Sequence, residues 1–234
     1  MGMLLRSPAS EEASAFYTAC ISLAVEHLHW QGILFRGISP YNMLVDERGH
    51  VQLGDFRFAR PDGGRAYTLC GDPDFRAPEM VSAKGHDSAV DWWSVGVFAW
   101  WMLRRRTPFE SETSVDGTEE TKANKYKRLL RAEYTVPPEF SEEAEAMLTA
   151  LLQRGVAKRV KATCCGVESL QHFGFFNKHV DFDSLTSPTA LRDVNPPAET
   201  VMHLLKNANH REYGNEPLDD VKCVESAEWL NDAF

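Results

Sequence analysis

The stretch Leu34-Phe35-Arg36-Gly37-Ile38-Ser39-Pro40-Tyr41-Asn42-Met43-Leu44 decides the fold when it is read together with three later motifs. It joins two short apolar runs through a polar turn, a pattern typical of short strands on either side of a loop. The later motifs are Asp55-Phe56-Arg57, Ala77-Pro78-Glu79 and Asp91-Trp92-Trp93. Four motifs in this order form a far more specific pattern than any one of them alone.

Around this stretch the sequence predicts a mainly helical fold. Ser10 can cap a helix whose first turn holds Glu11 and Glu12, and this helix is expected to end near Gly32. Residues 43–45 and 51–53 are expected to pair as a small β-hairpin across a turn. Further helices are expected over 88–103, over 126–131 and after a cap at Ser141, with a polar insertion over 110–122.

Composition excludes several classes of protein. The 234 residues carry 43% hydrophobic residues and a formal charge of −9, which indicates a globular core and argues against a nucleic-acid binder. Five cysteines without a C-x-x-C motif favour a reducing, cytoplasmic setting over a disulfide scaffold. The apolar run 92–103 is too short to span a membrane, so a buried helix is expected and no membrane partner.

The four motifs resemble the C-terminal lobe (C-lobe) of a eukaryotic protein kinase. Residues 68–75 and 90–97 look most like the AGC group, and within it the cyclic-nucleotide-dependent serine/threonine kinases. The resemblance implies a mainly α fold, with a kinase-like C-lobe over 1–180 that includes the small hairpin. It further implies an extended AGC-like tail over 181–234, in which Tyr213 and Phe234 echo tail motifs of the group.

The catalytic loop departs from the family pattern at two positions. The resemblance places Gly37 where working kinases carry the aspartate that receives the substrate hydroxyl, and Ser39 where they carry a lysine that steadies the phosphoryl group. Losing general-base catalysis alone typically lowers a rate about 10²- to 10⁴-fold. No intact catalytic residue is therefore expected.

Nucleotide and metal binding are expected to be weak. By resemblance, Asn42 and Asp55 would hold Mg²⁺, and Leu44 with Asp55 would form the floor of an ATP site. Arg57 replaces the glycine of the metal-binding turn, and the N-terminal lobe (N-lobe), with its glycine-rich loop and lysine strand, is missing from the chain. The family uses ATP and Mg²⁺, but no tightly bound cofactor is expected here. Alternatively, Asn42 and Asp55 are turn residues that bond the local backbone.

Other family positions are kept. Glu79 and Arg159 match a buried ion pair, and Asp91 matches a carboxylate that bonds the catalytic-loop backbone. Thr68 stands where the group carries its activation-loop phosphate, with Arg36 and Arg60 as the matching cations. The alternative is an unmodified threonine beside solvated arginines.

Several smaller hypotheses concern single side chains. Tyr41 and Trp101 replace acids that anchor arginine-rich substrates in the group, so such peptides would lose their anchors. Asp72 could reach toward the loop as a substitute carboxylate. His27 and His29 are expected to pack or to compensate the helix end in preference to binding metal.

These features favour a catalytically impaired, kinase-like (pseudokinase) C-lobe that acts as a binding, scaffolding or regulatory module. The expected partner is a protein, with a kinase N-lobe or a regulatory subunit as candidates. One alternative is a portion of an ATP-dependent AGC serine/threonine kinase whose N-lobe lies outside this chain. Another is an incomplete fragment whose uncovered apolar surface would aggregate.

Overall fold

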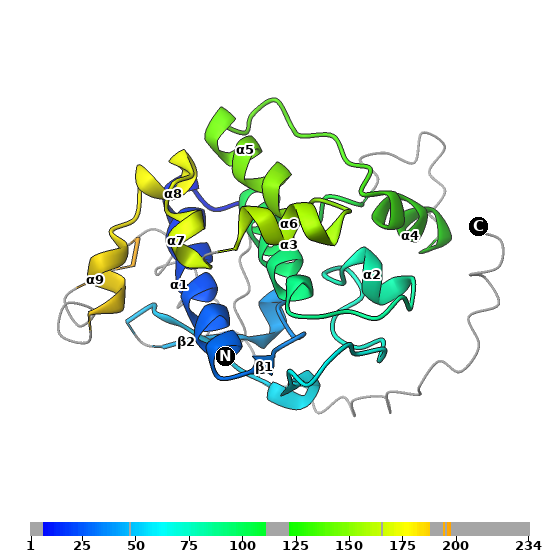
Figure 1. Cartoon of the computed structure of the whole chain (residues 1–234). Coiled ribbons are helices and arrows are strands. Elements are labelled where there is room, and N and C mark those ends of the chain that lie inside the picture. The colour runs from blue at the N-terminus through cyan, green and yellow to red at the C-terminus, as the bar shows by residue number, and fades with distance from the viewer. Residues whose placement is uncertain are drawn as a thin grey trace, which may run out of the picture.

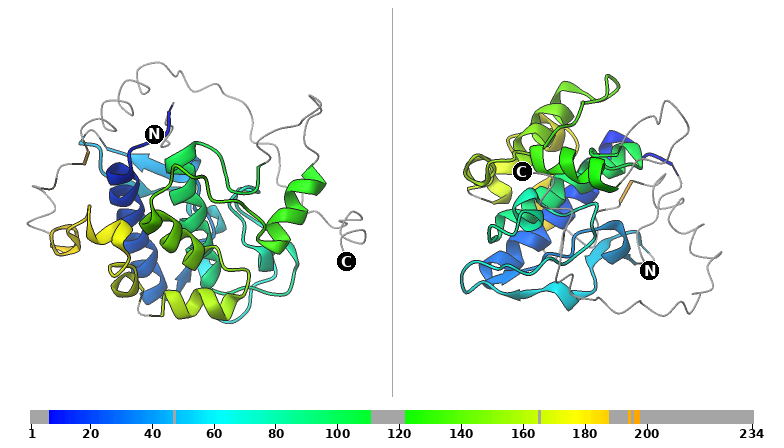
Figure 2. Two further views of the ribbon diagram at one scale, coloured as in Figure 1. Left: turned by 90° about the horizontal axis from the view of Figure 1, so that it is seen from above. Right: turned by 90° about the vertical axis from the view of Figure 1, so that its right-hand side faces the viewer.

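The structure is a computed structural model that describes residues 7–46, 48–110, 122–164, 166–187, 194, 196 and 197. Two long helices, α1 (Glu11–Trp30) and α3 (Ala89–Arg104), pack against each other in its centre (Figure 1). Figures 1 and 2 show shorter helices around this pair and the strands gathered at one end. The mainly α, C-lobe-like fold predicted from the sequence is confirmed.

Helix α1 begins and ends where the sequence predicts. The Ser10 side chain accepts a hydrogen bond from the backbone N–H of Ala13 at 3.2 Å, and Glu11 and Glu12 occupy the first turn. At the other end, Gly32 adopts a positive φ of 67°, which glycine tolerates without strain. The helix therefore runs directly into the segment that begins the catalytic-loop motif.

Helix α3 is a core helix. All of its residues from Ala89 to Met102 are buried, and Trp93 stacks on Phe109 with ring centroids 5.5 Å apart. A Cβ at Gly96 would lie 2.9 Å from the Cβ of Leu151, so only glycine allows α5 (Glu142–Leu151) to pack this closely. No helix within the described part of the chain is long and apolar enough to cross a bilayer.

The β structure is small and only partly anticipated. Strands β2 (Met43–Val45) and β3 (Val51–Leu53) pair antiparallel, as predicted. A second pair joins β1 (Ile33–Leu34) to β4 (Arg60–Pro61), which the sequence does not predict. The dipeptide Arg60-Pro61 does not predict a strand, because proline lacks a backbone N–H donor and is confined to the edge strands of sheets. The pairing instead reflects where the tertiary fold places the two segments.

The remaining helices surround the central pair. In Figure 1, α7 (Val167–Leu170), α8 (Gly174–Asn177) and α9 (Phe182–Thr186) lie on the side of α1 away from α4 (Lys122–Arg131). Ser141 caps α5 as predicted, through a bond from the N–H of Ala144 at 3.0 Å. The other elements are α2 (Pro78–Val81), α6 (Val156–Ala162) and two 3-10 turns, Pro40–Asn42 and Phe56–Phe58.

Parts of two predicted regions lie outside the described residues. The expected tail over 181–234 is described only over 181–187 and at residues 194, 196 and 197, and Phe182 and Leu185 of α9 are buried in the common core. Tyr213 and Phe234 are not among the described residues, and neither is most of the polar insertion, residues 111–121.

Candidate functional site

Asp91 fixes the backbone of the catalytic-loop segment. Its fully buried carboxylate accepts hydrogen bonds from the N–H groups of Phe35 at 3.0 Å and Arg36 at 2.7 Å. His29 Nε2 lies 2.8 Å from the same carboxylate, so this histidine of α1 pairs with an acid of α3. Arg36 has a left-handed φ of 56°. One buried charge thus holds two consecutive loop amides in place, the second of them in a left-handed, strained residue.

Gly37 leaves the centre of this loop without a side chain. A Cβ at Gly37 would meet the ring of Phe35 at 3.4 Å and Asn42 Nδ2 at 3.5 Å, which are ordinary contacts. The position has room for a side chain but presents no acceptor. Ser39 is 2% exposed and carries no charge. The loop therefore supplies neither a carboxylate nor a cation at these two positions.

The two candidate metal ligands are both engaged locally. Asn42 Nδ2 donates to the carbonyl of Gly37 at 2.8 Å. Asp55 accepts from Arg57 twice, through Nε at 2.8 Å and through the backbone N–H at 3.3 Å. Asp55 itself has a left-handed φ of 56°. Arg57 thus bonds one carboxylate oxygen of Asp55, Oδ1, and places a positive charge beside the carboxylate predicted to hold Mg²⁺.

Two apolar side chains beside these ligands are open to solvent. Leu44 is 38% exposed and Phe56 is 50% exposed, although Phe56 also packs edge-on against Phe35 at 5.2 Å. Leu44 is one of the residues predicted to form the floor of an ATP site, and Phe56 follows Asp55, a predicted metal ligand. Together they form an apolar floor, here meaning Leu44 and Phe56, that the described residues leave partly uncovered.

The two arginines predicted to bind a phosphate at Thr68 both place positive charge near His86. Arg36 Nη1 lies 3.4 Å from His86 Nε2, and Arg36 Nε donates to the carbonyl of Phe58 at 2.9 Å. Arg60 is half-buried, and its Nε donates to the carbonyl of Pro61 at 3.1 Å. Thr68 is exposed, and no hydrogen bond joins it to either arginine within the described ranges. His86 is a residue that sequence reasoning missed, because a lone loop histidine carries no motif.

The His86 imidazole gives the fold a dependence on pH. Burial, together with the positive charges of Arg36 and Arg60, lowers the pKa of His86 to about 4 from its ordinary 6.5. Above pH 6.5 the histidine is neutral in both states. Between pH 6.5 and 4 the unfolded chain takes up a proton that the folded chain refuses, so the free energy of unfolding falls as pH falls.

We expect this loss to reach about 2 kcal/mol by pH 5. Urea unfolding at pH 7.5, 6 and 5 measures it, and the comparison with His86→Gln separates it from the titration of carboxylates. The variant is expected to lose less stability over this range than the original chain. Parallel pH profiles for the two proteins would contradict this role of His86.

A buried ion pair ties the segment after the activation loop to the helical core. Arg159 is fully buried and donates to Glu79, to the carbonyl of Ala89 at 2.9 Å and to that of Gln153 at 2.8 Å. Burial raises the pKa of Glu79 and lowers that of Arg159, while their mutual attraction opposes both shifts. The predicted partners are thus brought together, 80 residues apart in the sequence.

The structure also places the residues of the smaller hypotheses. Asp72 accepts from the backbone N–H of Asp74 at 3.1 Å, so its carboxylate caps its own turn and is not bonded to the catalytic loop. Burial raises the pKa of Asp72. The Arg105 guanidinium lies 3.9 Å from the ring centroid of Trp101, which puts a cation against one position where basic-directed kinases carry an acid.

Comparison with known proteins identifies the family. A model described as the protein kinase domain matches residues 3–172, which is more than half of the chain. The chain belongs to the protein kinase family. The kinase loop motifs described above all lie within the matched residues, and so do Asp91, Glu79 and Arg159.

Curated kinases similar to this chain include cyclic-nucleotide-dependent and S6 kinases. It is 37% identical over 163 residues, 70% of its length, to cAMP-dependent protein kinase type 3 of Saccharomyces cerevisiae. It is 35% identical over 191 residues to human ribosomal protein S6 kinase alpha-3, and 32% identical over 209 residues to the cAMP-dependent protein kinase catalytic subunit of Dictyostelium discoideum. These matches cover 80% and 89% of the chain.

The chain spans only part of these relatives, namely 39%, 24% and 30% of their lengths in the same order. The predicted AGC-group resemblance is confirmed, because the relatives are AGC serine/threonine kinases. The activity, substrates and partners of this chain remain matters for proposal.

Proposed function

We propose that this chain is a catalytically impaired, kinase-like C-lobe that acts as a binding, scaffolding or regulatory module. The observation that carries the proposal is Gly37, a residue without a side-chain acceptor at the position where the family receives the substrate proton. Asp72, the substitute carboxylate suggested by the sequence, accepts a bond within its own turn.

The metal-binding turn supports the same proposal. The Arg57 guanidinium is bonded to one oxygen of the Asp55 carboxylate, so an Mg²⁺ ion held by that carboxylate would lie beside a positive charge. Meanwhile Asp91 and the Glu79–Arg159 pair hold the loop and the helical core in the family arrangement. The groups that maintain shape are kept, and those that perform chemistry are not, which is the pattern expected of a binding module.

A protein partner belongs to this proposal, with a kinase N-lobe or a regulatory subunit as candidates. The apolar floor of Leu44 and Phe56 supports a partner that covers it, because exposed large apolar side chains favour association. A cytoplasmic location is also proposed, supported by the free thiols of Cys20 and Cys70.

The alternative function is that of a portion of an ATP-dependent AGC serine/threonine kinase. The exposed floor and the partial coverage of the relatives favour it, because a covering N-lobe encoded elsewhere in a longer sequence would explain both. Such a lobe would supply nucleotide contacts. It would not supply the carboxylate missing at Gly37.

Mg-ATP is expected to produce neither a thermal shift nor phosphotransfer in the purified chain. Without a proton acceptor at position 37 and with Asp55 bonded to Arg57, the chain lacks the groups that orient substrate and metal. Differential scanning fluorimetry and radiolabelled transfer to serine and threonine peptides test this, with an active AGC kinase as the positive control. Transfer well above buffer that is lost in Asp55→Ala would overturn the proposal.

Arg57→Gly serves as a matched variant for the metal-binding turn. It removes the guanidinium from Asp55 and restores the residue type usual in the family. We expect this variant to gain a measurable thermal shift with Mg²⁺ that the original chain lacks. An Arg48→Gly variant, which alters an exposed arginine of the hairpin turn, controls for general charge effects.

A further inference from the structure

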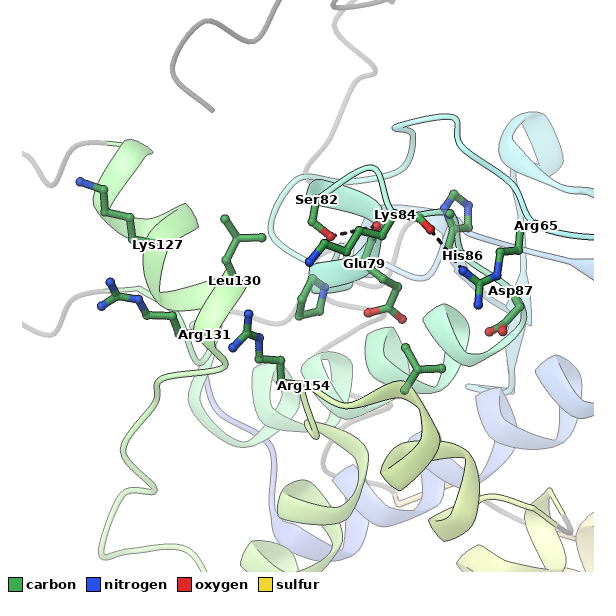
Figure 3. A pocket seen from close by; sticks show the side chains of 13 residues that line it. Arg65, Glu79, Ser82, Lys84, His86, Asp87, Lys127, Leu130, Arg131 and Arg154 are labelled. Carbon is green, nitrogen blue, oxygen red and sulfur yellow. Dashed lines mark hydrogen bonds between the residues drawn. The ribbon is translucent and has the colours of Figure 1, made fainter. Parts of the chain in front are cut away.

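A pocket of about 510 Å³ lies on the face of the molecule that carries α2 and α4. Its walls come from α2 and the turn after it, from α4, and from the turn that leads into α6. Figure 3 shows this pocket from close by. None of the catalytic-loop or metal-turn residues described above lines it.

The pocket is rich in positive charge. Five of its 13 lining residues are lysine or arginine, against two acids, Glu79 and Asp87. The five cations, to which the name basic pocket refers below, are Arg65, Lys84, Lys127, Arg131 and Arg154. The chain as a whole carries a formal charge of −9, so this concentration of cations is a local feature.

The two acids of the pocket offset only one of these five cations. Glu79 is bonded to the buried Arg159, whose charge it balances. Asp87 is the remaining acid, and it accepts a hydrogen bond from the N–H of Ala89 at 3.1 Å. His86 also lines the pocket, but its lowered pKa keeps it neutral at pH 7. The pocket therefore retains an excess of positive charge.

The cations are also available to a ligand. All five are exposed, and within the described ranges no ion pair joins Lys84, Lys127 or Arg154 to an acid. Arg131 lies 3.6 Å from Glu133, but both side chains are more than half exposed, and such pairs are weak. Arg65 donates only to the carbonyl of Lys84, at 3.4 Å.

The distribution of the cations indicates the shape of the ligand. Lys127 and Arg131 are four residues apart on α4 and share one face of that helix. Figure 3 shows them at one side of the pocket, with Arg65 at the other side and with Lys84 and Arg154 between. A single phosphate would need cations that converge on one point. Cations spread over separate walls suit several carboxylates along an extended chain.

We propose that the basic pocket binds an acidic, glutamate- and aspartate-rich segment of a partner protein. Leu130, Pro78 and Val156 also line it and offer apolar contact to the aliphatic parts of such a segment. Nucleic acid is a poorer fit, because its charge continues along a long backbone, whereas the cations are confined to one pocket of a chain whose net charge is −9. This binding goes beyond the proposed function and does not depend on it, since it stands whether or not the chain transfers phosphate.

The test uses the full 234-residue chain and a fluorescein-labelled acidic peptide of about ten residues, rich in glutamate and aspartate, followed by fluorescence anisotropy. We expect saturable binding that weakens as NaCl rises from about 50 to 300 mM, because salt screens exposed charges. The double variant Lys127→Glu/Arg131→Glu is expected to bind at least tenfold more weakly. Phosphotransfer assays on the same samples report separately on the proposed function.

The matched control is Arg48→Glu/Lys161→Glu, which changes the net charge equally but alters exposed residues outside the pocket. Its affinity is expected to stay within about twofold of the original. A second pocket variant, Lys84→Gln/Arg154→Gln, is expected to bind the peptide at least threefold more weakly. It replaces the α4 variant if that variant shows no cooperative thermal unfolding by circular dichroism and so has not folded.

Several results would overturn the proposal. One is equal loss of binding in the control and pocket variants, and another is equal affinity for a lysine-rich peptide of the same length. Binding of inorganic phosphate without peptide binding would assign the pocket to a free anion. Binding of vesicles containing phosphatidylserine, without peptide binding, would assign it to a membrane surface.

Discussion

Arg159→Met is expected to lower the free energy of unfolding by about 3 to 5 kcal/mol. The substitution keeps much of the side-chain volume but removes the guanidinium that donates to Glu79 and to the carbonyls of Ala89 and Gln153. It leaves the carboxylate of Glu79, which is 8% exposed, without its counter-ion. A buried charge without a partner is costly because it has lost water and gained nothing in return.

Urea unfolding followed by circular dichroism measures this loss. Lys161→Met is the matched control, since it makes the same kind of substitution at an exposed position of the same helix, α6. The control is expected to change stability by less than about 0.5 kcal/mol. A loss below about 1 kcal/mol for Arg159→Met would show that this ion pair does not tie the two segments together.

The partner substitution Glu79→Gln separates the two halves of the pair. Arg159 would keep its two carbonyl bonds, and the glutamine oxygen could still accept, so a smaller loss than for Arg159→Met is expected. The double variant Glu79→Gln/Arg159→Met should recover part of the loss, because no unpaired buried charge remains.

Asp91→Ala is expected to cost about 3 kcal/mol or more, because it leaves the buried backbone N–H groups of Phe35 and Arg36 without an acceptor. It also removes the carboxylate beside His29 Nε2. We expect the substitution to make the loop more mobile and also to lower the stability of the whole fold. Hydrogen exchange should therefore rise at residues 35–37 before global unfolding, as measured by mass spectrometry.

Asp87→Ala provides the matched control for Asp91→Ala. Its carboxylate accepts one backbone bond, from Ala89, at a partly exposed position four residues earlier in the chain. We expect a loss of about 1 kcal/mol, as for removal of a helix cap, with no change in exchange at residues 35–37. Equal effects of the two substitutions would contradict the anchoring role of Asp91.

The sequence determined the parts of this protein that depend on local chemistry. The Ser10 and Ser141 caps, the hairpin of β2 and β3 and the buried tryptophan-rich helix α3 could all be predicted. Capping, alternation and apolar periodicity act over a few residues, so they are legible in the chain itself. The absence of a carboxylate at Gly37 is likewise a fact of the sequence, read through the kinase resemblance.

The tertiary structure alone decided what depends on residues distant in the chain or on the direction of a side chain. The pairing of β1 with β4, the placement of Arg36 beside His86 and the basic pocket join segments that carry no shared local signal. Even Arg57 and Asp55, two residues apart, could have pointed away from each other. Charge and hydrogen bonding act through space, so only the folded chain shows which groups meet.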